Sequence, residues 1–145
     1  MLCCTPWKTA TCPFETLAGA VETVVQAFHC SVPMARIELL DAMQVRAVNL
    51  RSKLRLPEVP TLFFEFHGTP NGVAEQVETV KALASANGGG AFQWATLAED
   101  RNRLWRARHE SYYAAVNLRP GAIGLTTDVF PARIVGSAIG IGAFA

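Results

Sequence analysis

The sequence predicts an α+β fold, an antiparallel sheet with helices mainly on one face. β-prone segments alternate along the chain with segments whose apolar residues recur every three or four positions, which is the spacing of a helix with one buried side. Residues 61–67 (TLFFEFH) carry apolar side chains on both sides of a strand, which suggests a central position. The resulting order of strands and helices can be arranged as a ferredoxin-like split βαβ unit with an added helix and strand.

Local signals indicate where each element begins and ends. Pro13 lacks a backbone donor and ends the first strand. Asp41 and Asn71 can cap helices, because their side chains accept a hydrogen bond from the backbone of the first turn. Asn87-Gly88 ends a helix, because glycine tolerates the left-handed backbone conformation. The predicted strands are 7–12, 34–40, 61–67, 91–95 and 121–129, and the predicted helices are 16–29, 42–52, the segment between Asn71 and Asn87, and one that starts at Thr96.

The last helix contains a charged residue on its apolar side. Thr96 and Glu99 have the spacing of a capping box, which marks a helix start. At 100° per residue, Arg108 falls in the same stripe as Trp105 and Tyr112. A guanidinium in that position must reach out to water, pair with a carboxylate of the protein, or bind an anionic ligand. Spacing alone favours the first two alternatives.

Two further patterns have both a functional and a structural interpretation. Glu65 and His67 lie on the same side of a strand, so they form either an acid/base pair or a mutually satisfied polar patch on the sheet. The run at 88–90 (GGG) resembles a phosphate-binding loop, but it follows a helix and precedes a strand. Because phosphate loops present N–H groups from a helix start, we interpret this run as a helix end and turn.

Composition limits the classes of function. The 145 residues fit one domain, and a net charge of +1 with 17% charged residues gives no basis for a nucleic-acid partner. No apolar run approaches the ~20 residues of a transmembrane helix, and no targeting signal is legible at the amino terminus. The four cysteines lack C-x-x-C spacing, so we expect a reduced intracellular protein; they are Cys3, Cys4, Cys12 and Cys30. The three histidines are scattered over separate segments, so we expect no metal site built from them; they are His29, His67 and His109.

Five segments, in this order, resemble one family. They are CPFETLAGAV (12–21), ARIELLDAMQVRAVN (35–49), PTLFFEFHG (60–68), AEDRNRLWRARHESYYAA (98–115) and RPGAIGLTTDV (119–129). They are similar to the cap, or substrate, domain of FAD-linked D-2-hydroxyacid dehydrogenases, of the D-lactate dehydrogenase (cytochrome) and glycolate oxidase flavin subunit type. The resemblance implies an α+β cap, FAD as cofactor, oxidation of a small 2-hydroxy acid to a 2-oxo acid, and a mitochondrial location.

The resemblance also assigns residues. Arg108, at the L-W-x-x-R position, would bind the substrate carboxylate, and Tyr112 would line the same pocket. A guanidinium matches a carboxylate through two parallel hydrogen bonds, which fits this role. Two departures accompany the match: Ile123 stands where the family has a lysine, and the tail at 135–145 lacks the histidines and aspartate of the family pattern V-G-H-x-G-D-G-N-x-H, which supplies metal ligands.

We therefore expect residues 1–129 to be a substrate domain and 130–145 a degenerate tail, with the FAD-binding domain outside this sequence. On this interpretation the chain is a fragment of a dehydrogenase and is inactive alone, its partners being the hydroxy acid and the FAD domain. The alternative is a non-catalytic ferredoxin-like binding or assembly module that associates through its apolar surface.

Overall fold

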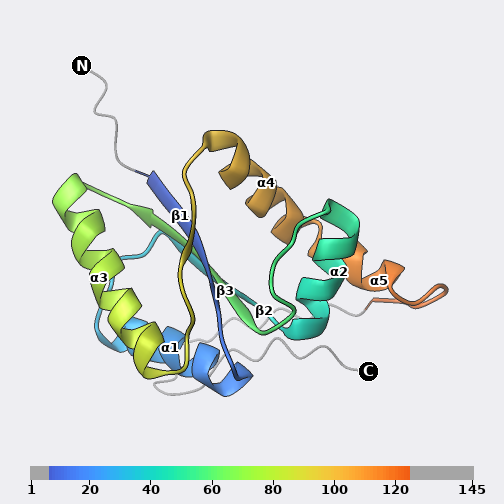
Figure 1. Ribbon diagram of the computed structural model, residues 1–145, viewed down its shortest axis with the longest axis horizontal. Coiled ribbons are helices and arrows are strands. Elements are labelled where there is room, and N and C mark those ends of the chain that lie inside the picture. The colour runs from blue at the N-terminus through green and yellow to red at the C-terminus, as the bar shows by residue number, and fades with distance from the viewer. Residues whose placement is uncertain (1–6, 125–145) are drawn as a thin grey trace.

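The computed structural model describes residues 7–124, and its strands form one four-stranded antiparallel sheet in the order β2-β3-β1-β4 (Figure 1). This order is that of the predicted split βαβ unit: β1 and β2, joined through α1, have β3 between them, and β3 and β4, joined through α3, have β1 between them. In chain order the elements are β1 (Trp7–Pro13), α1 (Leu17–His29), β2 (Arg36–Leu40), α2 (Ala42–Ser52), β3 (Thr61–His67), α3 (Pro70–Ala86), β4 (Gln93–Ala95), α4 (Ala98–His109) and α5 (Ser111–Asn117).

The main core lies between the sheet and helices α1 and α3, which Figure 1 shows on one side of the strands. Leu62, Phe64 and Phe66 of β3 point into this core and are fully buried. The phenylalanine between them, Phe63, points to the opposite face and is also fully buried. The central position predicted for this strand is therefore confirmed, since both of its faces are covered.

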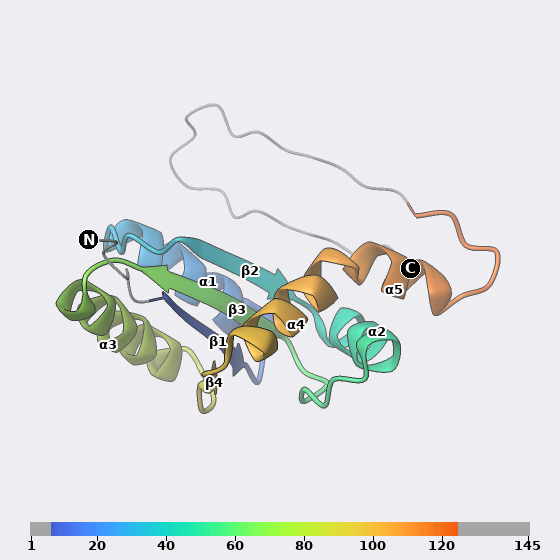
Figure 2. The ribbon, with the colours of Figure 1, turned by 90° about the horizontal axis from the view of Figure 1, so that it is seen from above.

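A smaller core forms on the opposite face, where α4 packs over Phe63. The ring centroids of Phe63 and Trp105 lie 6.3 Å apart, and Val45, Val48 and Ala107 belong to the same buried cluster. Figure 2 shows α4 leading into α5 beside α2 at one end of the sheet. Helices α1 and α3 thus cover the main face as predicted, while the added helix covers part of the second face, because an apolar Phe63 offers it a place to pack.

The capping box predicted at Thr96 is wrong, and the last helix is divided. Helix α4 starts after Leu97, which makes no side-chain capping bond, and the chain leaves helical geometry at Glu110 before α5 begins. The Ser111 carbonyl there accepts a hydrogen bond from Gln44 Nε2 at 2.8 Å, and Glu110 pairs with Arg51 of α2. The break between α4 and α5 thus lies where the chain contacts α2. Local periodicity could not predict it, because α2 is distant in the sequence.

Other boundaries differ as well: β2 starts at Arg36 rather than at residue 34, and β4 starts at Gln93 rather than at residue 91. Thr69, rather than Asn71, caps α3: its hydroxyl accepts from Gly72 N, and Pro70 occupies the first turn, where its missing N–H costs nothing. The predicted strand at 121–129 falls mostly outside the described residues, and residues 121–124 are not in a strand.

In the described part of the chain, none of the helices combines the length and the apolar character that a membrane crossing requires.

Cys12 and Cys30 are unpaired but differ in accessibility. Cys12 is fully buried in the main core, and burial raises the pKa of its thiol to about 11, whereas Cys30 is exposed at the end of α1. Because the thiolate is the reactive form, we expect iodoacetamide to modify Cys30 in the folded protein and Cys12 only after unfolding. Timed alkylation followed by peptide mass spectrometry measures both rates, and equal rates in the folded protein would contradict this prediction.

Candidate functional site

The sheet face beneath α4 carries charged side chains on the neighbouring strands β2 and β3. Because side chains alternate along a strand, Arg36 and Glu38 of β2 project on the same face as Phe63 and Glu65 of β3. In the register, Arg36 is opposite Glu65 and Glu38 is opposite Phe63. The face therefore carries one cation, Arg36, and two anions, Glu38 and Glu65, and α4 adds a second cation, Arg108.

Arg108 lies in the last turn of α4 and is paired within the protein. Its Nε forms an ion pair with Glu38 Oε2, and its Nη1 donates a hydrogen bond to Ser111 Oγ at 3.2 Å. About a quarter of each charged side chain is exposed, 26% for Arg108 and 27% for Glu38. Of the three alternatives open for this arginine, pairing with a carboxylate of the protein is the one the structure contains.

This pairing leaves part of the guanidinium available. A guanidinium has five N–H donors, and between residues 7 and 124 no hydrogen-bond partner is found for Nη2 of Arg108. Its Nε, although next to Glu38, has no acceptor in hydrogen-bond geometry there. Arg108 can therefore still donate to an added anion without leaving Glu38.

Trp105 holds the neighbouring cation. The guanidinium of Arg36 lies over the Trp105 ring, 4.4 Å from its centroid, which is a cation–π contact. The same ring packs against Phe63 on its inner side. Arg36 is thus held against Trp105, while Glu38, next to it on β2, is paired with Arg108.

Glu65 and His67 form the pair that their spacing suggested. Glu65 Oε1 lies 3.0 Å from His67 Nε2, and the carboxylate is only 4% exposed while the imidazole is 45% exposed. The other oxygen, Oε2, and the hydroxyl of the cross-strand partner Thr9 are both buried without a hydrogen-bond partner in the described chain. Some polar atoms on this part of the face therefore have a partner in the described chain and others have none.

The structure does not bring this pair to Arg108. Glu38 is opposite Phe63, and His67 is four residues further along β3. At roughly 3.3 Å per residue that separation is about 13 Å. A small acid bound at Arg108 would not reach His67, so the two sets of polar residues are separate.

Tyr112 has different contacts from Arg108. Its hydroxyl donates to the carbonyl of Gly124 at 3.3 Å, its ring packs edge-on against Tyr113, and it is 41% exposed. The break at Glu110 separates Arg108 on α4 from Tyr112 on α5, so a single continuous helix does not place them side by side. Ile123, at the position of the family lysine, is almost fully exposed.

Sequence reasoning missed the two actual partners of Arg108, which are Glu38 and Ser111. A signal existed for each. Glu38 alternates onto the face of β2 opposite the main core, and Ser111 is three residues after Arg108, which is one helical turn. Choosing Glu38 required knowing that α4 crosses that face.

The described residues do not offer a site for a dinucleotide at the glycine run. Gly88 has a left-handed backbone (φ 79°), and Gly89 N donates to the Ala84 carbonyl, so this run ends α3 as predicted. A flavin cofactor would therefore have to be held by residues other than these.

No group of three or more His, Cys, Asp or Glu side chains able to hold a metal occurs within residues 7–124. The tail with the altered metal motif lies outside these residues.

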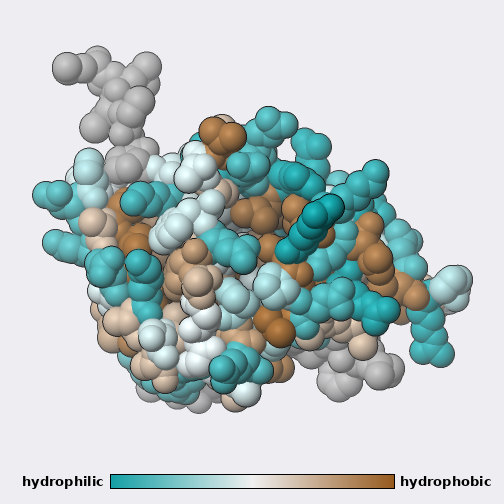
Figure 3. All heavy atoms as spheres, viewed as in Figure 1, coloured by the Kyte–Doolittle hydropathy of each residue, from teal (hydrophilic) through white to brown (hydrophobic). Residues whose placement is uncertain are grey.

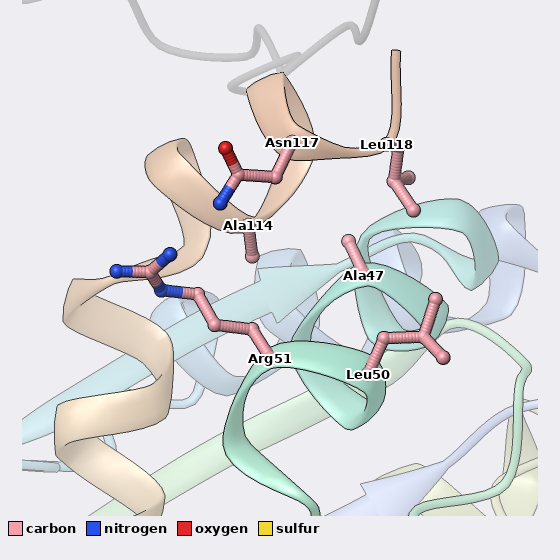
Figure 4. Close-up of a pocket in the computed structure, with 6 residues that line it drawn as sticks. All are labelled: Ala47, Leu50, Arg51, Ala114, Asn117 and Leu118. Atoms are coloured by element: carbon pink, nitrogen blue, oxygen red, sulfur yellow. The ribbon is translucent and has the colours of Figure 1, made fainter. Parts of the chain in front are cut away.

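A shallow hollow of about 350 Å³ lies between α2 and α5, away from the Arg108–Glu38 pair (Figure 4). Its lining is mostly apolar, with two polar side chains, and consists of Ala47, Leu50, Arg51, Ala114, Asn117 and Leu118. Figure 3 shows that the surface over α4 and α2 is largely hydrophilic, with apolar side chains between.

Residues 6–133 match the family described as FAD linked oxidases, C-terminal domain. The chain belongs to this family. It is 44% identical over 120 residues to a protein of Danio rerio named probable D-lactate dehydrogenase, mitochondrial. The matched residues cover 83% of this chain and 24% of that protein. It is 36% identical over 120 residues to D-lactate dehydrogenase [cytochrome], mitochondrial, of Arabidopsis thaliana, covering 83% of this chain and 21% of that protein.

The chain thus spans a quarter or less of the length of these relatives. A solved structure named alkyldihydroxyacetonephosphate synthase is similar with a TM-score of 0.58 and 14% identity, over 78% of this chain and 24% of that chain. At this identity the likeness concerns the fold alone. The α+β fold and the family expected from the sequence are both confirmed.

Proposed function

We propose that this chain is the substrate-binding domain of an FAD-dependent D-2-hydroxyacid dehydrogenase of the D-lactate type, and that Arg108 binds the substrate carboxylate. The observation that carries the proposal is the position of Arg108, whose guanidinium is partly exposed above the sheet with Nη2 unengaged within residues 7–124. Glu38 and Ser111 hold the group in place, so an added anion meets a guanidinium whose orientation is already fixed. The names of the two relatives support the choice of substrate class.

The role of this domain is to orient the acid. FAD held in the parent protein would supply the acceptor for the hydride that leaves the carbon bearing the hydroxyl group. Fixing the carboxylate at Arg108 restricts how that carbon can be presented, and such positioning lowers the barrier by reducing the entropy lost on reaction. Because Ile123 has no charge, the proposed carboxylate site depends on Arg108; Tyr112 would join it only by giving up its bond to Gly124.

We propose a mitochondrial location from the names of the relatives, and a longer protein in which an FAD domain is the partner of this one. The test is a chimera in which this chain replaces the matching segment of the Danio rerio protein. We expect a flavin absorption spectrum and dye reduction that depends on D-lactate and not on L-lactate. A flavin-loaded, folded chimera that does not oxidise any D-2-hydroxy acid would contradict the proposal.

A non-catalytic assembly module is the second candidate, favoured by exposed apolar side chains on α2 and α5, the helices that line the hollow of Figure 4. Met43, Leu50 and Tyr113 of these helices are each at least 60% exposed, and Leu50 lines the hollow itself. Exposed apolar patches of this kind mark interaction surfaces. Sedimentation velocity distinguishes the candidates, because a chain that remains monomeric over a wide concentration range argues against self-association.

A further inference from the structure

Each two-donor edge of the Arg108 guanidinium includes a nitrogen that already lies next to a protein partner. A carboxylate binds a guanidinium through two adjacent N–H groups, either Nε with Nη2 or Nη1 with Nη2. In this structure Nε faces Glu38 and Nη1 bonds to Ser111. An incoming carboxylate that takes either edge therefore competes with one of these two partners.

Ser111 is the partner that can be displaced more easily. Its hydroxyl is neutral, it accepts at 3.2 Å, and it can rotate, whereas the Glu38 contact joins two opposite charges. Hydrogen bonds between ionised groups are roughly twice as strong as neutral ones. The incoming carboxylate would thus take the Nη1–Nη2 edge while Glu38 remains beside Nε.

This arrangement places two negative groups on neighbouring edges of one cation. The resident carboxylate of Glu38 already compensates the charge of Arg108, and both side chains are about three-quarters buried, where like charges repel more strongly than in water. Arg36, the other cation on this face, is held over Trp105, and within residues 7–124 it forms no ion pair with Glu38.

We infer that Glu38 is a positioning residue with two opposed effects: it aligns the Arg108 guanidinium, and it weakens the binding of external carboxylates there. The inference rests on the proposed function, since it takes a carboxylate as the ligand of Arg108. A site of this kind holds its cation in one geometry when empty. It releases a carboxylate product readily, because Glu38 still compensates the charge of Arg108 and Ser111 can return to Nη1.

The experiment is an NMR titration of the whole 145-residue chain with sodium D-lactate at constant ionic strength, following the Nε–Hε resonance of Arg108. Arg108→Lys identifies that resonance by removing it. Glu38→Gln keeps an acceptor beside Nε but removes the charge, and Glu38→Ala removes both. The matched control is Glu110→Gln, which alters the ion pair between Arg51 of α2 and Glu110 at the break after α4, where N and O are 3.2 Å apart.

We expect Glu38→Gln to lower the Kd for D-lactate by about tenfold, the effect of removing one nearby like charge in a partly buried site. Glu38→Ala should tighten binding less, because the guanidinium loses its alignment, and Glu110→Gln should leave the Kd within twofold. A purely structural role for Glu38 would weaken binding, so tightening separates the two roles. Thermal melting establishes that each variant is folded.

The possible failures are distinguishable. A Glu38→Gln Kd equal to or above the wild-type value overturns the inference while leaving Arg108 as a carboxylate site. Equal Kd values for Glu38→Ala and Glu38→Gln, both below the wild-type value, overturn the alignment effect alone. If D-lactate produces no saturable shift in the wild type, Glu38→Gln or Glu38→Ala, then Arg108 does not bind the carboxylate, and the proposed role of this residue fails together with the inference.

Discussion

Replacing Arg108 by alanine in the flavin-loaded chimera is expected to reduce kcat/KM for D-lactate by a factor of a hundred to a thousand. Truncating one partner of a charge-assisted hydrogen-bonded pair costs about 2–5 kcal/mol, and each 1.4 kcal/mol is about a factor of ten. Most of the loss should appear in KM, because the side chain binds the acid in both the ground state and the transition state. Steady-state dye reduction over a range of D-lactate concentrations separates the two constants.

Two companion variants make this result interpretable. Arg108→Lys retains the charge but not the planar pair of donors, so we expect it to recover only a small part of the activity. Arg51→Lys makes the same change in the surface pair with Glu110 and should leave kcat/KM nearly unchanged. Since Arg108→Ala also leaves Glu38 without its cation, flavin content and melting temperature must match those of the parent; an unchanged kcat/KM in a folded Arg108→Ala chimera refutes the assigned role.

Replacing Phe63 by alanine is expected to lower the free energy of unfolding of the chain by about 3–5 kcal/mol, the usual cost of removing a buried aromatic ring. Phe63 is fully buried and packs against Trp105, so its loss opens a cavity beneath α4. Such a loss is a large share of the roughly 5–15 kcal/mol that stabilises a typical domain. Urea titration monitored by tryptophan fluorescence measures it.

Phe28→Ala is the matched control, because the Phe28 ring is 62% exposed on α1. Its substitution should change the free energy of unfolding by less than about 1 kcal/mol. The same Phe63→Ala sample should also bind D-lactate more weakly in the NMR titration, since α4 carries Arg108 and rests on Phe63. A Phe63 variant as stable as Phe28→Ala would mean that α4 does not pack where the structure places it.

Much of the fold could be read from local patterns. The bounds of α2 and β3 match the prediction, and the Asp41 side chain accepts from Gln44 N at 2.7 Å as a helix cap should. These features depend on interactions within a few residues, such as capping and the alternation of side chains on a strand. The errors, at Thr96 and at the break before Ser111, occur where contacts with other elements outweigh local preference.

The sequence by itself determined the fold class, the family and the presence of a cation on the apolar side of the last helix, because periodicity and ordered motifs are properties of neighbouring residues. Only the tertiary structure decided what that cation contacts. Arg108 meets Glu38 because β2 turns alternate residues toward α4 and Phe63 gives α4 a surface on which to pack. Glu38 and Arg108 are far apart in the chain, so their pairing depends on the register of the sheet and the path of the helix across it, which no local pattern encodes.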